Sequence, residues 1–370
     1  MVVRVFFTRM RSLAGIALLA ILLPKPTLAQ EGAGSRITPS NAVVITGYGT
    51  VGYLHRPEKN AAPSTFSASF SPIFLFQFQD RFLFESELEF DVEDGVTQTG
   101  LEYAQLDVIA SDHVVLVGGK FLVPFGVFGE RLHPTWINKL PTPPPLYGHH
   151  TSEFGAEPLL PVLSDLGVMA KASIERGPWY LTLNGYVTQG PSIGEVEGPG
   201  VPPELEFPGS TGDTNHNKMV GGRLDVALPP WMEVNLSVLN ADYDENNVLD
   251  FTAWNVAAEA RHKGVEIRGE YIETRQEFET LTGFPTLVRR GFYSQASYRR
   301  GSWEPVFRFT KMFDDEIDGT AEETAAWQVA FGIDYWFGPS VALMAGYEVN
   351  REGGIETSND RLIVHVAFGF

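Results

Sequence analysis

Hydrophobic and polar residues alternate along most of this chain, in segments of about ten residues that end at turn residues or polar loops. In the segment 82–91, for example, apolar side chains alternate with glutamates over much of its length. Alternation with a period of two predicts β-strands whose two faces meet different environments. The pattern predicts sixteen strands, over residues 43–54, 66–79, 82–91, 101–110, 114–127, 166–175, 179–189, 219–228, 232–243, 251–261, 265–277, 292–300, 303–313, 325–337, 341–350 and 362–370.

Tight turns and longer connections alternate between these strands. Short turns such as Asp80-Arg81 are followed by loops such as 190–216. This asymmetry is typical of an outer-membrane β-barrel, whereas soluble β-sandwiches mix long and short connections. Aromatic residues beside the tight turns are expected at a membrane interface, namely Trp179, Trp231, Trp303, Trp336 and Phe337. The sequence therefore predicts an all-β, transmembrane antiparallel barrel of about sixteen strands, with short periplasmic turns and longer outer loops.

The last predicted strand, 362–370, has an apolar face that ends on Phe370. It resembles the C-terminal strand of bacterial outer-membrane β-barrels. An unshielded apolar strand is an aggregation hazard at the edge of a soluble sheet, whereas a closed barrel pairs both edges of every strand. The alternative is a last strand that is buried in a soluble sandwich.

The first residues predict export through the Sec pathway. Arg4, Arg9 and Arg11 precede a short apolar run, and Thr27-Leu28-Ala29 has the small-residue spacing of a cleavage site. We expect residues 1–29 to be a signal peptide, 30–42 a short periplasmic segment and 43–370 the barrel. A retained membrane anchor is the alternative, although the apolar run is shorter than the roughly twenty residues of a membrane-spanning helix. No plug domain is expected before residue 43, which favours an open lumen.

Charge and cysteine content exclude some functions. The chain has 27 Lys+Arg and 46 Asp+Glu, and loss of the four basic residues in 1–29 would leave a net charge of −23. This balance argues against nucleic acid as a partner, because binding to phosphates requires a basic surface. The chain has no cysteine, so it forms no disulfide and no thiolate metal site.

The segment 118–136 reads GGKFLVPFGVFGERLHPTW. It resembles the G-[KR]-F-x-x-P-F-G segment of porins related to the phosphate-selective porin O/P group. The resemblance implies a sixteen-stranded outer-membrane porin, usually trimeric, whose lumen is narrowed by the third long loop. Here the third long connection is 128–164, which is our candidate constriction loop. Its many prolines exclude a strand and make the segment stiff, and a protease-resistant loop outside the barrel is the alternative.

Charged residues on the polar faces of the strands are expected to line a wet lumen, because charges that face lipid are costly. The candidate pore-lining residues are Glu85, Glu87, Glu89, Lys120, Lys171, Arg223, Arg261, Arg268, Arg299 and Arg308. In the constriction loop the candidates are Glu130, Arg131, His133 and Trp136. We expect an arginine wall opposite an acidic one, which would orient solutes and select ions. The alternative is that these charges only pair across strands.

The sequence departs from the phosphate-selective relatives in having few lysines and a strongly acidic balance, so a general or cation-preferring pore is expected. No catalytic motif is present, and we expect no cofactor and no metal. His149-His150 beside Glu153 and Glu157 is a weak candidate for a metal site.

From the predicted barrel and its polar lumen we expect passive diffusion of small hydrophilic solutes or ions through a homotrimer that sits in outer-membrane lipid. A barrel enzyme of the esterase or phospholipase type, or a structural or adhesive barrel without an open pore, are the alternatives.

Overall fold

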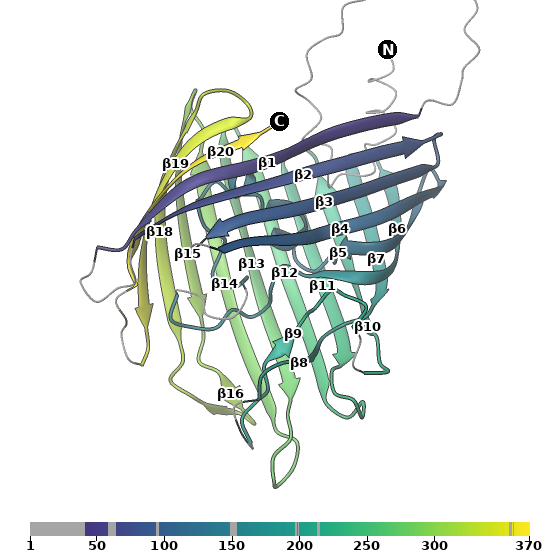
Figure 1. Ribbon diagram of the computed structural model, residues 1–370, viewed down its shortest axis with the longest axis vertical. Helices are drawn as coiled ribbons and strands as arrows, with labels where there is room; N and C mark the ends of the chain where they lie inside the picture. Colours follow the sequence, from purple (N-terminus) through teal and green to yellow (C-terminus); the bar gives the residue numbers. More distant parts are fainter. Residues whose placement is uncertain are drawn as a thin grey trace, which may run out of the picture.

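The computed structural model describes residues 41–57, 64–93, 96–148, 154–196, 198, 200–212, 215–354, 357 and 359–370. Over these residues the chain forms a closed antiparallel barrel of sixteen wall strands (Figure 1). The prediction of an all-β barrel with sixteen strands is confirmed. Among the described residues, no helix is long and apolar enough to cross a membrane.

The wall strands are β1 (Ala42–His55), β2 (Thr65–Phe78), β3 (Phe82–Glu93), β4 (Val96–Ser111), β5 (Val114–Leu122), β6 (Ser164–Arg176), β7 (Trp179–Thr188), β10 (Met219–Leu228), β11 (Met232–Asp242), β12 (Asp250–His262), β13 (Val265–Glu277), β14 (Thr286–Tyr298), β15 (Trp303–Met312), β18 (Ala326–Trp336), β19 (Val341–Glu352) and β20 (Arg361–Gly369). Two short hairpins lie in the loops, formed by β8 (Ser192–Ile193) with β9 (Leu205–Glu206) and by β16 (Glu316–Ile317) with β17 (Thr320–Ala321). Between β5 and β6 lie a single π-helical turn, η3 (Phe128–Leu132), and a short helix, α2 (Thr135–Asn138).

The first and last strands close the barrel. β1 pairs with β20 in antiparallel register from Tyr48 opposite Gly369 to His55 opposite Leu362. At the end of this seam, the backbone N–H of Phe370 donates to the carbonyl of Gly47 at 3.0 Å. Closure satisfies the backbone polar groups of both edge strands, which a membrane would leave without water.

The two ends of the barrel differ. Short turns join β2 to β3, β6 to β7 and β12 to β13 at one end, which we call the tight-turn end. The longer connections lie at the other end, the long-loop end (Figure 1). The alternation of short and long connections that the sequence predicts is therefore present, except between β3 and β4, which only residues 94–95 separate.

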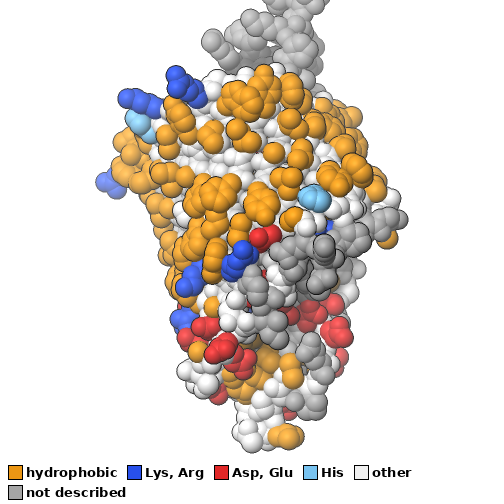
Figure 2. Space-filling model, turned by 90° about the vertical axis from the view of Figure 1, so that its left-hand side faces the viewer, with side chains coloured by type: hydrophobic (Ala, Val, Ile, Leu, Met, Phe, Trp, Pro, Cys, Tyr) orange, Lys and Arg blue, Asp and Glu red, His pale blue; other side chains and the backbone are white. Residues whose placement is uncertain are grey.

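The outer face of the wall is apolar and the inner face is polar. Outward side chains such as Leu236 and Phe331 are more than half exposed, at 53% and 55%. Inward side chains such as Asn255 and Thr310 are fully buried, and both are polar. Figure 2 shows hydrophobic side chains over a broad area of the face in view. A soluble protein has the opposite arrangement, with a polar exterior and an apolar interior. A wide apolar exterior needs lipid around it, so this arrangement defines a transmembrane barrel.

Each of the sixteen predicted strands corresponds to one wall strand, but some boundaries are wrong. β5 ends at Leu122 and not at residue 127, because the chain turns inward there and Gly126 has a φ of 64°. β4 begins at Val96 and β14 at Thr286, five and six residues earlier than predicted, since the added residues, 96–100 and 286–291, continue the ladder without alternating between apolar and polar. The predicted signal peptide and residues 30–40 lie outside the described residues.

Candidate functional site: the lumen and the loop inside it

The connection 123–163, which we call the lumen loop, leaves the wall well below the long-loop end. β5 has only nine residues, and β4 pairs with it only from Ala104 onward, so the first part of β4 extends beyond it. The two ends of the loop are joined by a hydrogen bond from the backbone N–H of Val123 to the carbonyl of Leu163 at 2.8 Å. The loop therefore starts and ends at mid-wall, from where it turns into the barrel.

One carboxylate on β13 holds the beginning of the lumen loop. Glu270 is buried and faces inward, and its two oxygens accept five hydrogen bonds of 2.7–3.1 Å. The donors are the backbone N–H groups of Val127 and Phe128, the hydroxyls of Tyr147 and Tyr293, and the amide of Asn255. These five hydrogen bonds offset the free-energy cost of burying the charged carboxylate. They also fix the position of the η3 turn.

Three inward arginines hold backbone carbonyls further along the loop. Arg223 donates to Gly126 at 2.8 Å, and Arg268 donates to Asn138 at 2.5 Å. Arg308 donates to Thr142 at 2.9 Å. The three arginines come from β10, β13 and β15, so the loop follows the inner surface of that wall.

These arginines are covered by the loop, which corrects the expectation of an exposed arginine wall. Arg223, Arg268 and Arg308 are only 4%, 3% and 0% exposed. Each also lies within ion-pair distance of a carboxylate, which is Asp225 for the first, Glu266 for the second and Glu348 for the third. Their charge is therefore neutralised locally, and their function in the structure is to hold the loop.

Glu130 and Arg131 of η3 form ion pairs with the wall. Glu130 lies 2.5 Å from Arg223, and Arg131 lies 2.6 Å from Glu233 and 3.4 Å from Asp225. Burial alone would raise the pKa of Glu130, but the charges of Arg223, Lys171 and Arg131 outweigh it and hold that pKa at about 2. Burial would lower the pKa of Arg131, and its carboxylate neighbours raise it instead.

The loop reaches nearly to the tight-turn end. Lys139 lies 2.9 Å from Glu266 and 3.0 Å from Glu304, which are near the tight-turn ends of β13 and β15. Trp136 packs against the backbone of Gly369 on β20 and against the cluster around Trp336. The lumen loop thus spans much of the barrel's height as well as its width.

Apolar packing inside the lumen supports these polar contacts. Phe128 is fully buried, and its ring lies 5.0 Å from that of Tyr147 and 6.5 Å from that of Tyr293. The connection between β7 and β10 adds Phe207, whose ring lies 5.9 Å from that of Phe251. The half of the lumen beside β10–β15 is therefore filled by folded loops with an apolar core.

His133 brings the loop to the opposite side of the lumen. Its Nε2 atom lies 3.4 Å from the hydroxyl of Tyr48 on β1, and that hydroxyl donates to Glu87 on β3 at 2.6 Å. Its Nδ1 atom lies 2.6 Å from the carbonyl oxygen of Gly129. Burial lowers the pKa of His133 to about 4, although the bond to Gly129 acts in the other direction, so the ring is neutral at pH 7.

The wall formed by β3 and β4 is acidic, and the basic side chains that attract its carboxylates are Lys171, which acts on Glu85 and Asp107, and Lys120, which acts on Glu102. Its inward carboxylates are Glu85, Glu87, Glu89 and Asp91 on β3, with Asp107 on β4 and Glu102 at a β-bulge. Among the described residues, none of them forms an ion pair with a lysine or arginine, and one oxygen of Glu85 has no hydrogen-bond partner. The lumen thus has a side on which carboxylates outnumber bases, with Lys171 as a partial counter-charge, opposite a side on which the charges are paired.

The remaining pore-lining candidates lie in different places. Lys171 faces inward on β6 between Val115 and Asn184. Arg261 is half exposed at the tight-turn end of β12, where it pairs with Glu259 and Glu266. Arg299 lies beyond the end of β14, with its guanidinium 4.3 Å from the ring centre of Trp336.

Lys120 does not face the lumen, which corrects its assignment. It is opposite Ala104 and Leu166, on the same face of the sheet as the exposed side chains of Leu116 and Val168. Its ammonium group donates to the carbonyl of Leu101 at 2.7 Å. A lysine at the end of a short strand escapes the lipid in this way, because its long stem carries the charge to a polar group.

No group of three metal-ligating side chains occurs among the described residues. His149, His150 and Glu153 lie outside them, and Glu157 lies 3.3 Å from Arg289. The sequence did not single out Glu270, Asn138 or Thr142 as site residues. Glu270 lies on the polar face of its strand like many other charged residues, and its partners on the loop have no local sequence signal.

No family model matches the chain, and no curated protein matches it. The fold resembles that of outer-membrane porins. An anion-selective porin from Comamonas acidovorans is 11% identical with a TM-score of 0.56, over 90% of this chain and 100% of that chain. The outer membrane channel DcaP of Acinetobacter baumannii is 12% identical with a TM-score of 0.57, over 91% and 100%. The trimer form of OmpT, an outer membrane protein of Vibrio cholerae, is 10% identical with a TM-score of 0.56, over 90% and 100%. At these identities the likeness concerns the fold, which is that of a sixteen-stranded transmembrane barrel.

Proposed function

We propose that the protein is an outer-membrane porin through which small hydrophilic solutes or ions diffuse passively, with a preference for cations. The observation that carries this proposal is the division of the lumen. The lumen loop fills the side next to β10–β15, and on the β3–β4 wall of the other side the carboxylates outnumber the one lysine, Lys171, that acts on Glu85 and Asp107. An enzyme or a structural barrel has no comparable support among the described residues.

The path that we propose runs between the lumen loop and the wall strands β2, β3 and β4. The loop is held by hydrogen bonds to strands β10, β13 and β15, and by His133 to Tyr48 on β1. Toward the long-loop end the inward side chains of this wall are accessible, as at Glu89, Asp91 and Gln98. Glu85 and Glu87 lie deeper, beside His133, and are nearly fully buried, so we infer that the constriction of the path is there.

A cation preference follows from the charges along that path. The arginines on the loop side form ion pairs with carboxylates, whereas the wall side has several carboxylates and one attracting base, Lys171, which acts on Glu85 and Asp107. Unpaired charge in a narrow, low-dielectric passage attracts counter-ions and excludes ions of its own sign. The phosphate selectivity that the 118–136 segment suggests does not fit this arrangement.

The fold and the outward apolar band support a position in the outer membrane of a Gram-negative bacterium. The proposal that residues 1–29 are the Sec signal depends on the sequence pattern alone. A homotrimer is consistent with the trimer form of the Vibrio cholerae protein that shares the fold. Chemical crosslinking of the detergent-solubilised chain tests the trimer.

Planar-bilayer recording in a salt gradient tests the function. We expect discrete conductance steps and a reversal potential whose sign reports cation preference. A strong anion preference would refute the selectivity, and the absence of any conductance, together with no swelling of liposomes in small sugars, would refute the pore itself.

A further inference from the structure

The last three wall strands bring an aspartate, a methionine and a histidine into one row on the inner face. β18, β19 and β20 lie side by side (Figure 1), and Asp334 is opposite Met344, which is opposite His365. All three side chains point inward, since they alternate with outward residues such as Leu343 and Val366. Side chains that are directly opposite on one face have Cβ atoms about 5 Å apart, so neighbours in this row can bind a common ligand.

Asp334 is a buried carboxylate without a hydrogen-bond donor. It is 0% exposed, and neither of its oxygens has a hydrogen-bond partner in the described part of the chain. Its cross-strand neighbour Glu304 is equally deep but has three donors at 2.9–3.0 Å, which are Ser297, Lys139 and Trp336. Lys139 and Arg299 attract the charge of Asp334, but between described residues neither forms an ion pair with it. A carboxylate that is buried in this way needs a positive group beside it.

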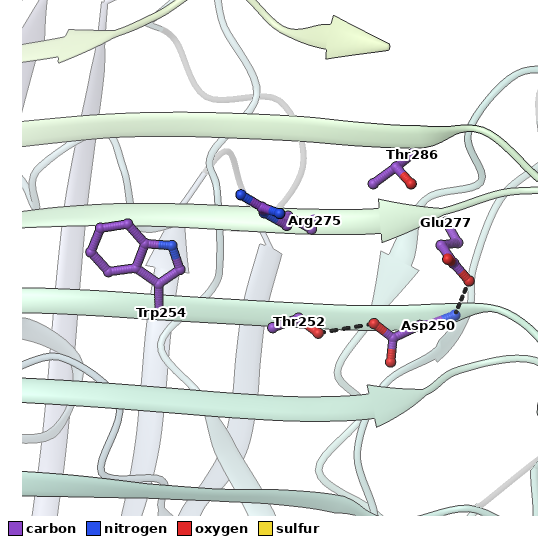
Figure 3. A pocket seen from close by; sticks show the side chains of 6 residues that line it. All are labelled: Asp250, Thr252, Trp254, Arg275, Glu277 and Thr286. Carbon is purple, nitrogen blue, oxygen red and sulfur yellow. Dashed lines mark hydrogen bonds between the residues drawn. The ribbon is translucent and has the colours of Figure 1, made fainter. Parts of the chain in front are cut away.

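Carboxylates on the outer face of the wall are paired with their neighbours. A groove of about 530 Å³ on the outer face of β12–β14 is lined by such groups (Figure 3). There the hydroxyl of Thr252 donates to Asp250 at 2.9 Å, and Glu277 accepts from the backbone N–H of Asp250 at 3.4 Å. The isolation of Asp334 is therefore a property of its own site and not of the carboxylates of this barrel in general.

The imidazole of His365 is also without a partner on its inner edge. Its Nδ1 atom is buried and has no hydrogen-bond partner among the residues that the structure describes. The edge with Cδ2 and Nε2 lies over Gly52 of β1, where a Cβ atom would be 2.0 Å from Cδ2 and 2.4 Å from Nε2. Nδ1 is on the other edge of the ring, away from β1 and on the side of β19, the strand of Met344. A nitrogen in this position can bind an ion beside the methionine.

Met344 supplies a thioether sulfur at the centre of the row. Its side chain is fully buried in a small cluster against which the indole of Trp136 packs. Nε1 of Trp136 is buried as well and has no hydrogen-bond partner within the described ranges. Among the methionines of the described strands, only Met344 has a histidine opposite it. A thioether, an imidazole and an aromatic ring therefore lie together where the lumen loop contacts β19 and β20.

This combination of groups suits a soft, singly charged metal ion. Thioethers favour soft ions such as Cu(I), and imidazole is also a good ligand for copper. An aromatic face stabilises a cation that lies over it. One positive charge balances the buried charge of Asp334. Hard or divalent ions need more oxygen or nitrogen ligands, and over the described residues no three His, Cys, Asp or Glu side chains form a group that could hold a metal.

We propose that Met344 and His365 bind one soft monovalent metal ion, of the Cu(I) type, inside the barrel. The thioether sulfur of Met344 and Nδ1 of His365 are the ligands, Trp136 covers the ion, and Asp334 balances its charge. Because Trp136 belongs to the lumen loop, the ion also attaches the loop to β19 and β20. Binding is independent of conduction, so failure of one proposal leaves the other intact.

The test uses the full chain in detergent and silver(I) nitrate as the probe, because Ag(I) is a soft ion like Cu(I) and needs no reductant. The chain has no cysteine, so no thiolate competes for the ion. Native mass spectrometry counts the bound ions, and isothermal titration calorimetry in a chloride-free buffer measures the affinity. We expect one Ag(I) per chain to bind at least tenfold more tightly than Zn(II), and to quench part of the tryptophan fluorescence.

Two variants test the ligands. Met344→Leu and His365→Asn are each expected to weaken Ag(I) binding at least tenfold. Met312→Leu is the matched control, because this methionine is also buried and inward but is opposite Gly291 and Ala326. Leucine has nearly the volume of methionine, so both leucine variants are expected to fold, which a heat-modifiable band on SDS gels verifies.

The proposal is overturned if Ag(I) binds equally well to the wild type, Met344→Leu and His365→Asn. It is also overturned if Met312→Leu loses as much affinity as Met344→Leu, or if Zn(II) binds as tightly as Ag(I). Asp334→Asn, which removes the balancing charge, is expected to weaken Ag(I) binding at least threefold, and unchanged affinity in this variant would refute the role of Asp334.

Discussion

The carboxylate of Glu270 on β13 accepts the backbone N–H of Phe128 at 2.7 Å, across 142 residues of sequence. With its four other donors, this group positions the beginning of the lumen loop against the wall. Replacing the carboxylate by an amide keeps the size but puts an NH₂ group against other donors. The beginning of the loop therefore depends on one charge more than on any other side chain that we describe.

We expect Glu270→Gln to lower the stability of the barrel by roughly 2–4 kcal/mol, the cost of leaving buried donors unsatisfied. The freed loop is expected to raise the single-channel conductance and its noise. Denaturation in detergent and bilayer recording measure the two effects. Glu273→Gln, on the outer face of the same strand, is the control and is expected to leave conductance unchanged; equal conductance in wild type and Glu270→Gln would contradict the role of this anchor.

The acidic wall gives a prediction for ion selectivity. A unit charge about 4 Å from a permeating ion contributes about 1 kcal/mol even in water, which is about a fivefold change in occupancy. We expect Glu87→Gln and Glu89→Gln each to reduce the cation-to-anion permeability ratio by about twofold to fivefold. Reversal potentials in a salt gradient measure this ratio.

The matched control for the selectivity variants is Glu245→Gln, which removes an exposed charge from the loop between β11 and β12. It is expected to leave the permeability ratio at the wild-type value. If Glu245→Gln changes the ratio as much as the wall variants do, overall charge and not the β3–β4 wall determines selectivity.

Acid is expected to loosen the lumen loop through His133. Burial lowers the pKa of this histidine from its ordinary 6.5 to about 4, next to Tyr48 and Glu87. The unfolded chain binds this proton more readily, so stability falls as the pH decreases from about 6.5 to about 4, by on the order of 2–3 kcal/mol at pH 4.5. Glu130, with its pKa at about 2, contributes stability above pH 4.5 that is lost as the pH falls through 2.

Denaturation midpoints at pH 7 and pH 4.5 measure the effect of His133. His133→Gln cannot be protonated and is expected to lose about 2 kcal/mol less than the wild type between these two pH values. An equal loss in the two proteins would show that other groups cause the acid sensitivity.

The wall strands could be predicted from the sequence because the pattern that identifies each strand lies within a short stretch of neighbouring residues. A strand that separates lipid from a polar lumen alternates with a period of two, and each of the sixteen strands has this pattern over its apolar part. The attachment of the lumen loop could not be predicted in the same way. Thr142 and Arg308 are 166 residues apart, and no nearby pattern indicates that one bonds the other.

Lys120 is an exception to the expectation that charged residues of the strands face the lumen. Alternation from Val117 puts this lysine on the outer face, but the cost of a charge in lipid argued for the lumen. The contact with Leu101 satisfies the ammonium without a reversal of the strand, and this contact depends on the irregular start of β4. Charged residues with short side chains must face the lumen to avoid lipid. A long side chain near a strand end can start on the outer face and still bring its charged end to a polar group.

Gly126 gives the sharpest test of how the loop enters the lumen. Its φ of 64° favours glycine, and a Cβ atom there would lie 2.5 Å from an oxygen of Glu270 and 2.6 Å from the hydroxyl of Tyr147. We expect Gly126→Ala to cost roughly 1–2 kcal/mol for the backbone alone, and more for displacing the carboxylate. Gly129→Ala is the matched control, because the nearest atom to its Cβ would be 3.6 Å away. In bilayer recordings Gly126→Ala is expected to raise conductance as Glu270→Gln does, and Gly129→Ala is expected to leave it unchanged. Similar behaviour of the two alanine variants would mean that the entry of the loop does not depend on this contact.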